Sequence, residues 1–144
     1  MAKLFPLAGL LRLRQIQQDQ AASDLAAANA RVRESTARER RARAALGGIA
    51  PDVTDTTVLY AIAASRAASR SMLGELQALE AANKTEADAA GQAFTAARAR
   101  SVGLEKLEAK HVDGVRSADL SAEQNVLDEI VTTGWHRTAE GQAI

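Results

Sequence analysis

The feature that most constrains this chain is a stripe of apolar residues that recurs in alternating steps of three and four. It first runs from Leu4 to Leu46, and nine of these thirteen positions are apolar. The same stepping from Leu59 to Ala122 gives twelve apolar positions out of nineteen. A spacing of about 3.5 residues keeps one face of a helix turned towards a partner helix, as in a coiled coil. We therefore expect an all-α protein.

The two stripes are separated by a cluster of residues that ends helices. Gly47 and Gly48 come first, and Pro51 follows them. Glycine accepts the left-handed conformation that ends many helices, and proline cannot continue the hydrogen-bond ladder. We expect helix one over about 5–46, a turn over about 47–55 and helix two over about 56–133, opened by Thr54 or Asp55 as the N-cap. The remaining residues, 135–144, are expected to form a flexible tail of a single coiled-coil domain, 1–144.

The simplest architecture is an antiparallel two-helix coiled-coil hairpin with a longer second helix. If Leu46 meets Leu59 at the tip, facing residue numbers add to about 105, Leu4 faces Ser101, and about thirty residues of helix two extend beyond helix one. The alternative is a three-helix bundle in which helix two breaks near Asn83 or Gly91. Because 33 of the 144 residues are alanine, the face between the helices buries little area, and we expect marginal stability.

The composition excludes several kinds of chemistry. There is no cysteine, so disulfides and thiolate metal sites are ruled out. The only histidines are His111 and His136, and Glu108 with His111 makes a weak metal pair. We expect no enzyme activity, no metal and no cofactor. Eighteen basic and eighteen acidic residues balance, which argues against a nucleic-acid partner, and no segment resembles a signal peptide or a membrane span.

The charges are unevenly distributed along the chain, and so are the large apolar residues. Residues 31–43 have six arginines against two glutamates, whereas residues 101–134 have seven acids against three bases. We expect helix one to leave uncovered the following apolar residues of helix two: Leu104, Leu107, Val112, Val115, Leu120, Val126, Leu127, Ile130 and Trp135. A second exposed group is expected at the tip, around Leu59, Tyr60 and Ile62. These surfaces predict an interaction protein.

Two segments resemble the flagellar export protein FliJ family. Residues 5–14, FPLAGLLRLR, resemble its opening, in which an aromatic residue and leucines precede arginine. Residues 122–130, AEQNVLDEI, followed by Trp135, resemble its C-terminal segment. The length and the glycine-broken hairpin also fit, so the resemblance covers nearly the whole chain.

The resemblance implies a hairpin similar to the stalk of the rotary ATPase gamma subunit, and it implies the following partners. The protein would bind the hexameric export ATPase, the cytoplasmic linker of the export gate and export chaperones, and would lie in the cytoplasm at the inner face of the membrane through these partners. The residues implied for the ATPase ring are Leu120, Glu123, Leu127, Ile130 and Trp135. Those implied for the export gate are Leu59, Tyr60, Ile62, Arg40 and Arg41.

Two other functions are compatible with the sequence. The first is a structural coiled-coil protein that buries the end of helix two in a homodimer. The second is a periplasmic or nucleoid-associated helical protein, which would have to shift DNA in a salt-sensitive way.

Overall fold

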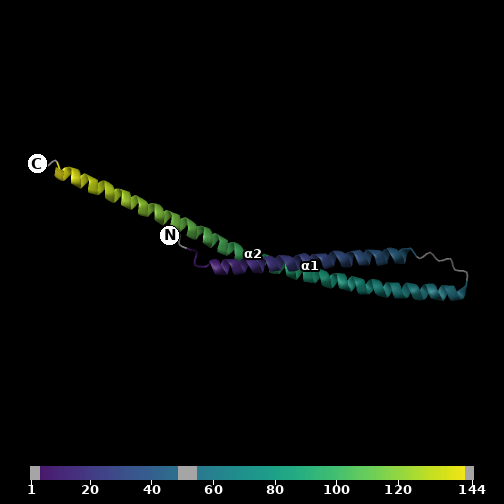
Figure 1. The fold of residues 1–144 in the computed structure, drawn as a ribbon. Coiled ribbons are helices and arrows are strands. Elements are labelled where there is room, and N and C mark those ends of the chain that lie inside the picture. Colours follow the sequence, from purple (N-terminus) through teal and green to yellow (C-terminus); the bar gives the residue numbers. More distant parts are fainter. Residues whose placement is uncertain (1–3, 49–54, 142–144) are drawn as a thin grey trace. The chain divides into compact units, whose positions relative to one another are not determined.

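The computed structural model describes residues 4–48 and 55–141, and this part of the chain forms two helices and no strand. Helix α1 spans Ala8–Gly47 and helix α2 spans Thr56–Gly141. The fold is therefore an all-α, antiparallel two-helix hairpin with a longer second helix, as the sequence predicts (Figure 1).

Both ends of α1 and the start of α2 lie close to the predicted residues. The Ala8 N–H donates to the Phe5 carbonyl at 3.0 Å, which opens α1. At the other end the Gly48 N–H donates to the Ala44 carbonyl at 3.1 Å, and no described glycine has a positive φ, so the expected left-handed cap is absent from the described residues. Helix α2 opens where the Leu59 N–H donates to the Asp55 carbonyl at 3.1 Å, so Asp55 takes the N-cap position. The other proposed N-cap, Thr54, lies outside the described residues.

The chain divides into two units, and each contains a segment of both helices. The first is Gln15–Ala99, and the second, which we call the terminal unit, combines Met1–Arg14 with Arg100–Ile144. In the Gln15–Ala99 unit the two helices lie side by side (Figure 1), and the Thr36 hydroxyl donates to the Glu80 carboxylate at 3.0 Å across them. In the terminal unit the rings of Phe5 and His111 lie 5.6 Å apart.

The register between the helices differs from the predicted one. The numbers of Thr36 and Glu80 add to 116, as do those of Phe5 and His111, whereas the prediction was about 105. Leu46 therefore does not face Leu59. The difference of eleven residues is about three helical turns, so a shift of this size keeps the same faces in contact. A face lined by alanine has similar contact energies in such registers. The hydrogen bond between Thr36 and Glu80 stabilises the observed one.

The face along which the helices pack, which we call the seam, is where the prediction is most accurate. On α1 all eleven predicted positions from Leu11 to Leu46 are buried or half-buried. On α2 the same holds for the predicted positions from Ser69 to Val115. Few side chains are deeply buried: Leu11 is 6% exposed, Ala28 2%, Ser35 2% and Ser101 0%. Leu4, Leu7 and Leu59 are exposed, so the seam is shorter than predicted at its ends.

Helix α2 is longer than predicted and unbroken. It passes through Asn83 and Gly91, so the three-helix alternative is wrong. It also continues past Gly134 to Gly141, so the flexible tail predicted from residue 135 is wrong for residues 135–141. A single glycine costs a helix only about 1 kcal/mol. The residues after Gly134 include no proline, and arginine, alanine and glutamate among them are good helix formers, so the helix continues.

Candidate protein-interaction surfaces

The end of α2 forms the first candidate surface. Every described residue after Val115 is exposed, and we call residues 116–141 the C-terminal segment. All five residues implied for the ATPase ring lie in it and are exposed, among them Leu127 (61%) and Trp135 (76%). Further large apolar side chains are exposed in the same segment: Leu120, Val126, Ile130 and Val131. The structure therefore places these predicted residues together on one uncovered helix.

The predicted extent of this surface was too large. Leu104 and Val115 were expected to be uncovered, but both are half-buried and occupy seam positions. The shifted register explains this, because His111 of α2 packs against Phe5 at the start of the chain. His111 therefore belongs to the seam, and the uncovered part of α2 starts after Val115.

The second candidate surface lies at the start of α2. Leu59 is 51% exposed and Tyr60 is 74% exposed, as expected, whereas Ile62 is half-buried. Arg40 and Arg41 are exposed too, but in this register they lie opposite residues near 75 and 76 of α2. Those residues are about 25 Å from Leu59 along the helix axis. The structure therefore does not bring Arg40 and Arg41 beside the apolar tip residues.

Other arginines lie closer to the tip. A shallow groove of about 300 Å³ is lined by Leu59, Ile62, Ala63, Arg66, Ala67 and Arg70. Arg66 and Arg70 were not assigned to this site from the sequence. Their spacing from Leu59 could have predicted this position, because residues seven and eleven further along a helix lie on the same face as the first.

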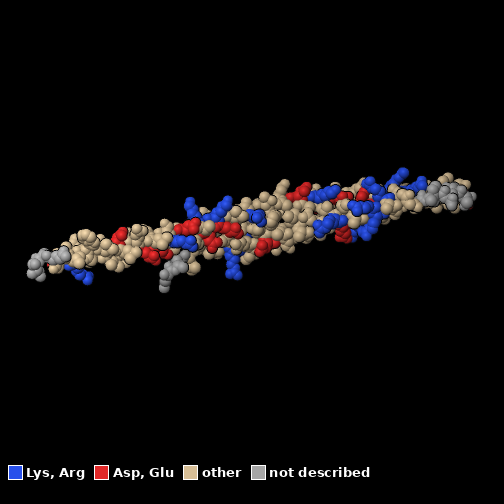
Figure 2. Space-filling model, turned by 90° about the horizontal axis from the view of Figure 1, so that it is seen from above, with Lys and Arg blue, Asp and Glu red and all other residues tan. Residues whose placement is uncertain are grey.

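The Gln15–Ala99 unit has a basic surface near the turn (Figure 2). Several of its arginines form ion pairs with exposed acids. Arg38 bridges Glu34 on the same helix, and Arg31 lies 3.5 Å from Glu86 of α2. Exposed pairs of this kind contribute about 0 to 1 kcal/mol, so they do not prevent the arginines from binding an acidic partner.

Polar groups interrupt the seam in the same unit. The Glu80 carboxylate accepts hydrogen bonds from Lys84 Nζ at 2.8 Å and from the Thr36 hydroxyl at 3.0 Å. These bonds, the one from Lys84 first, lower the pKa of Glu80 below its ordinary value of 4.5. The Asn83 amide also reaches across the seam and donates to the Arg31 carbonyl at 3.4 Å. These contacts join the two helices in the observed register.

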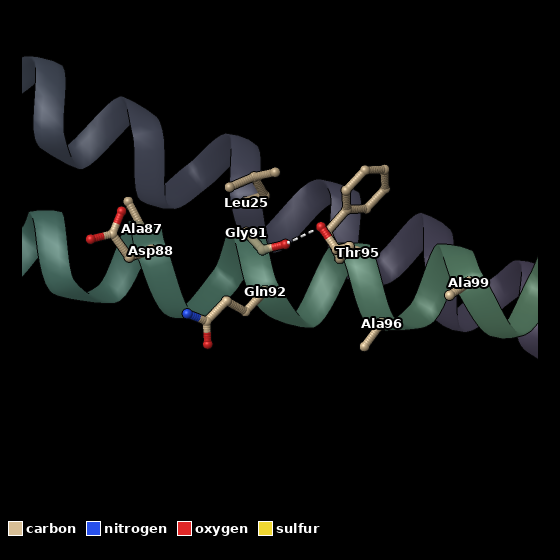
Figure 3. Close-up of a pocket in the computed structure, with 9 residues that line it drawn as sticks. Leu25, Ala87, Asp88, Gly91, Gln92, Thr95, Ala96 and Ala99 are labelled. Carbon is tan, nitrogen blue, oxygen red and sulfur yellow. Dashed lines mark hydrogen bonds between the residues drawn. The ribbon is translucent and has the colours of Figure 1, made fainter.

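A groove of the Gln15–Ala99 unit lies beside Leu25 of α1 and Gly91 of α2. It has a volume of about 810 Å³ and is open to solvent, and Asp88 is the only ionisable residue among the described residues that line it. Gly91 lies against Leu25, and the Thr95 hydroxyl donates to the Gly91 carbonyl at 3.0 Å (Figure 3). Small side chains such as Ala87 and Ala99 form most of the remaining wall. The groove has the character of a surface between packed helices.

Residues 4–48 and 55–141 contain no group of three His, Asp or Glu side chains placed to hold a metal ion. Within the same residues, neither helix has a stretch long and apolar enough to cross a bilayer.

Comparison with known proteins gives no relative: no protein-family model, no curated protein and no solved structure matches the chain.

Proposed function

We propose that the chain is a non-enzymatic, stalk-like coupling factor and general chaperone of flagellar type III protein export. It links the hexameric export ATPase to the cytoplasmic linker of the export gate, meets export chaperones, and acts in the cytoplasm at the inner face of the membrane. The proposal rests on the resemblance of residues 5–14 and 122–130 to the FliJ family, together with a hairpin whose second helix is longer.

One observation carries the proposal: the C-terminal segment is helical and has large apolar side chains that no other described segment covers. Leu120, Leu127 and Ile130 are each about 60% exposed, and Trp135 is more exposed still. Large contiguous apolar surface on a soluble chain marks a site of protein or membrane interaction. Tryptophan in particular is enriched among the residues that dominate binding energy.

The test is a binding titration with a purified flagellar export ATPase hexamer. We expect one chain per hexamer, because a single stalk occupies the centre of a ring. Six equivalent sites, or no binding, would contradict the proposal. The double variant Leu127→Asp, Ile130→Asp should abolish binding and keep the far-UV helicity, since neither residue belongs to the seam. The matched control is Met72→Asp with Leu79→Asp, two exposed apolar residues of the Gln15–Ala99 unit.

The tip provides a separate test of the gate interaction. Leu59→Asp with Tyr60→Asp should abolish binding to the isolated cytoplasmic linker of the export gate and leave binding to the ATPase unchanged. Loss of both interactions would mean that the variant has lost its fold, which circular dichroism would reveal.

The alternative function is a homodimeric structural coiled coil, because the exposed C-terminal segment could also be covered by a second copy. Sedimentation equilibrium separates the two. A monomer at tens of micromolar supports the coupling factor, and a stable dimer that does not bind the ATPase supports the alternative.

A further inference from the structure

We infer that the C-terminal segment binds an apolar groove with basic groups along its edges, through a face of α2 that does not continue the seam. This inference rests on the proposed function only in that the segment binds another protein. It adds which face is bound and what the partner surface must contain.

The two faces can be separated by helix geometry. Consecutive residues are rotated by about 100° around a helix axis. The last seam residues of α2 are Leu104, Glu108, His111 and Val115, all half-buried. Continuing their spacing leads to Ala118, Ala122 and Val126 and then to Glu129 and Thr133. This continuation soon becomes polar, so it offers little apolar area to a helix that would extend the seam.

The large apolar residues of the segment lie elsewhere. Leu120, Leu127 and Val131 fall within about 40° of one another and are rotated by about 150° from the mean direction of the seam residues. Ile130 and Trp135 flank this stripe on its two sides. All five side chains are at least 59% exposed. The docking face is therefore almost opposite the side on which α1 packs.

The charges around the stripe determine the character of the partner. Glu123 lies beside it on one edge and Asp128 on the other, by the same rotation of about 100° per residue. Arg116 also lies on the edge of Glu123, whereas Asp119, Glu129 and Glu140 lie away from the stripe. A partner surface with basic groups at its edges would pair with Glu123 and Asp128, and such complementarity raises association rates and specificity. A second copy of the same segment would bring like charges together, so it is a poorer partner.

Neighbouring residues on different faces give a matched test with the ATPase hexamer. Leu127→Asp should lower affinity at least tenfold, whereas Val126→Asp, at a residue 55% exposed on the seam side, should have less than a threefold effect. Asp128→Lys should weaken binding and reduce its salt dependence, and Glu129→Lys, on the opposite face, should do neither. Equal losses in the two members of either pair would overturn the assignment of the face.

A second experiment does not depend on the ATPase. The chain has a single tryptophan, Trp135, which lies at the edge of the stripe and reports binding by fluorescence. The full chain is titrated with a synthetic amphipathic helix that has leucine on one face and lysine along both edges. A second titration uses the same peptide with glutamate in place of the lysines.

Each outcome of these experiments supports or overturns either the inference or the proposed function. A blue shift with the lysine peptide only, lost in Leu127→Asp and kept in Val126→Asp, supports the inference. An equal or larger response to the glutamate peptide, or no response to either, overturns it, and so does a dimer joined through Leu127 in sedimentation and cross-linking. Peptide binding without ATPase binding would refute the proposed function and leave the inference intact.

Discussion

The burial of the Ser101 side chain leads to a prediction about the stability of the fold. It is 0% exposed, and its hydroxyl has no hydrogen-bond partner among the described residues. A buried hydroxyl that gives up water without gaining a partner costs about 1 to 3 kcal/mol. Alanine also has a higher helix propensity than serine, by about 0.5 kcal/mol. We therefore expect Ser101→Ala to raise the free energy of unfolding by about 1.5 to 3.5 kcal/mol.

Two other serines are matched controls because they share the helix propensity but differ in environment. Ser71 is exposed, so Ser71→Ala should gain only about 0.5 kcal/mol. Ser35 is 2% exposed, but its hydroxyl donates to the Val32 carbonyl at 3.0 Å. Losing that bond costs about 0.5 to 1.5 kcal/mol, so Ser35→Ala should be neutral or slightly destabilising.

The assay is urea unfolding of the full chain followed by far-UV circular dichroism. With a slope of about 1 to 3 kcal/mol per molar urea, the predicted midpoint for Ser101→Ala lies well above those of both controls. If Ser101→Ala shifts the midpoint no more than Ser71→Ala does, its hydroxyl is satisfied in solution, and the reasoning from burial is refuted. A destabilised Ser101→Ala would refute it more strongly.

Three further predictions test the register, the pH dependence and the end of α2. In this cysteine-free chain, Leu25→Cys with Gly91→Cys should form a disulfide on mild oxidation. Val32→Cys with Leu73→Cys, which fits the register that adds to 105 and leaves Glu80 in place, should not form one. The reverse result would restore that register. The Glu80 carboxylate accepts a bond from Lys84, which lowers its pKa below the ordinary value of 4.5, so the ionised carboxylate stabilises the fold above that pH and this stability is lost as the pH falls. Glu80→Gln should therefore show a shallower loss of stability between about pH 7 and pH 3 than the unsubstituted chain. Parallel plots of stability against pH for the two proteins would contradict this role of the carboxylate. Gly134→Ala should raise the free energy of local opening around it by about 1 kcal/mol, measured as slower amide hydrogen exchange, because alanine favours a helix and the added Cβ meets no atom within 4 Å. Unchanged exchange would argue against a helix there.

The pattern of apolar residues was sufficient to predict which faces of the helices are buried. This works because alternate steps of three and four return to one side of a helix whatever the residues are. Even polar residues that the stepping places in the seam are buried there, such as Ser35 and Ser101. Helix ends were also predicted well where strong signals cluster, as at Gly47 and Asp55.

The register and the end of α2 could not be predicted by the same argument. A stripe that repeats every turn has several alignments of similar apolar contact, so the choice falls to particular polar pairs such as Thr36 with Glu80. These pairs can be recognised only when both helices are placed. Helix two was expected to end near residue 133, but the one glycine that follows, Gly134, is a small penalty in a long helix. The observed register also separates Arg40 and Arg41 from Leu59.

The composition of α2 connects these results to the proposed function. From Ser69 to Val115 the seam residues of α2 are buried or half-buried, and several of them are alanine, so this part can pack closely against α1 but gains little area. Other apolar residues of the same part, among them Leu107 and Val112, lie off the seam and are exposed. After Val115 the larger residues Leu120, Leu127 and Ile130 leave the seam face. Replacing these residues would remove no packing contact from the hairpin. Their side chains expose apolar surface to water, which is energetically unfavourable. Folding therefore does not account for them, whereas the proposed partner on the other side of α2 would.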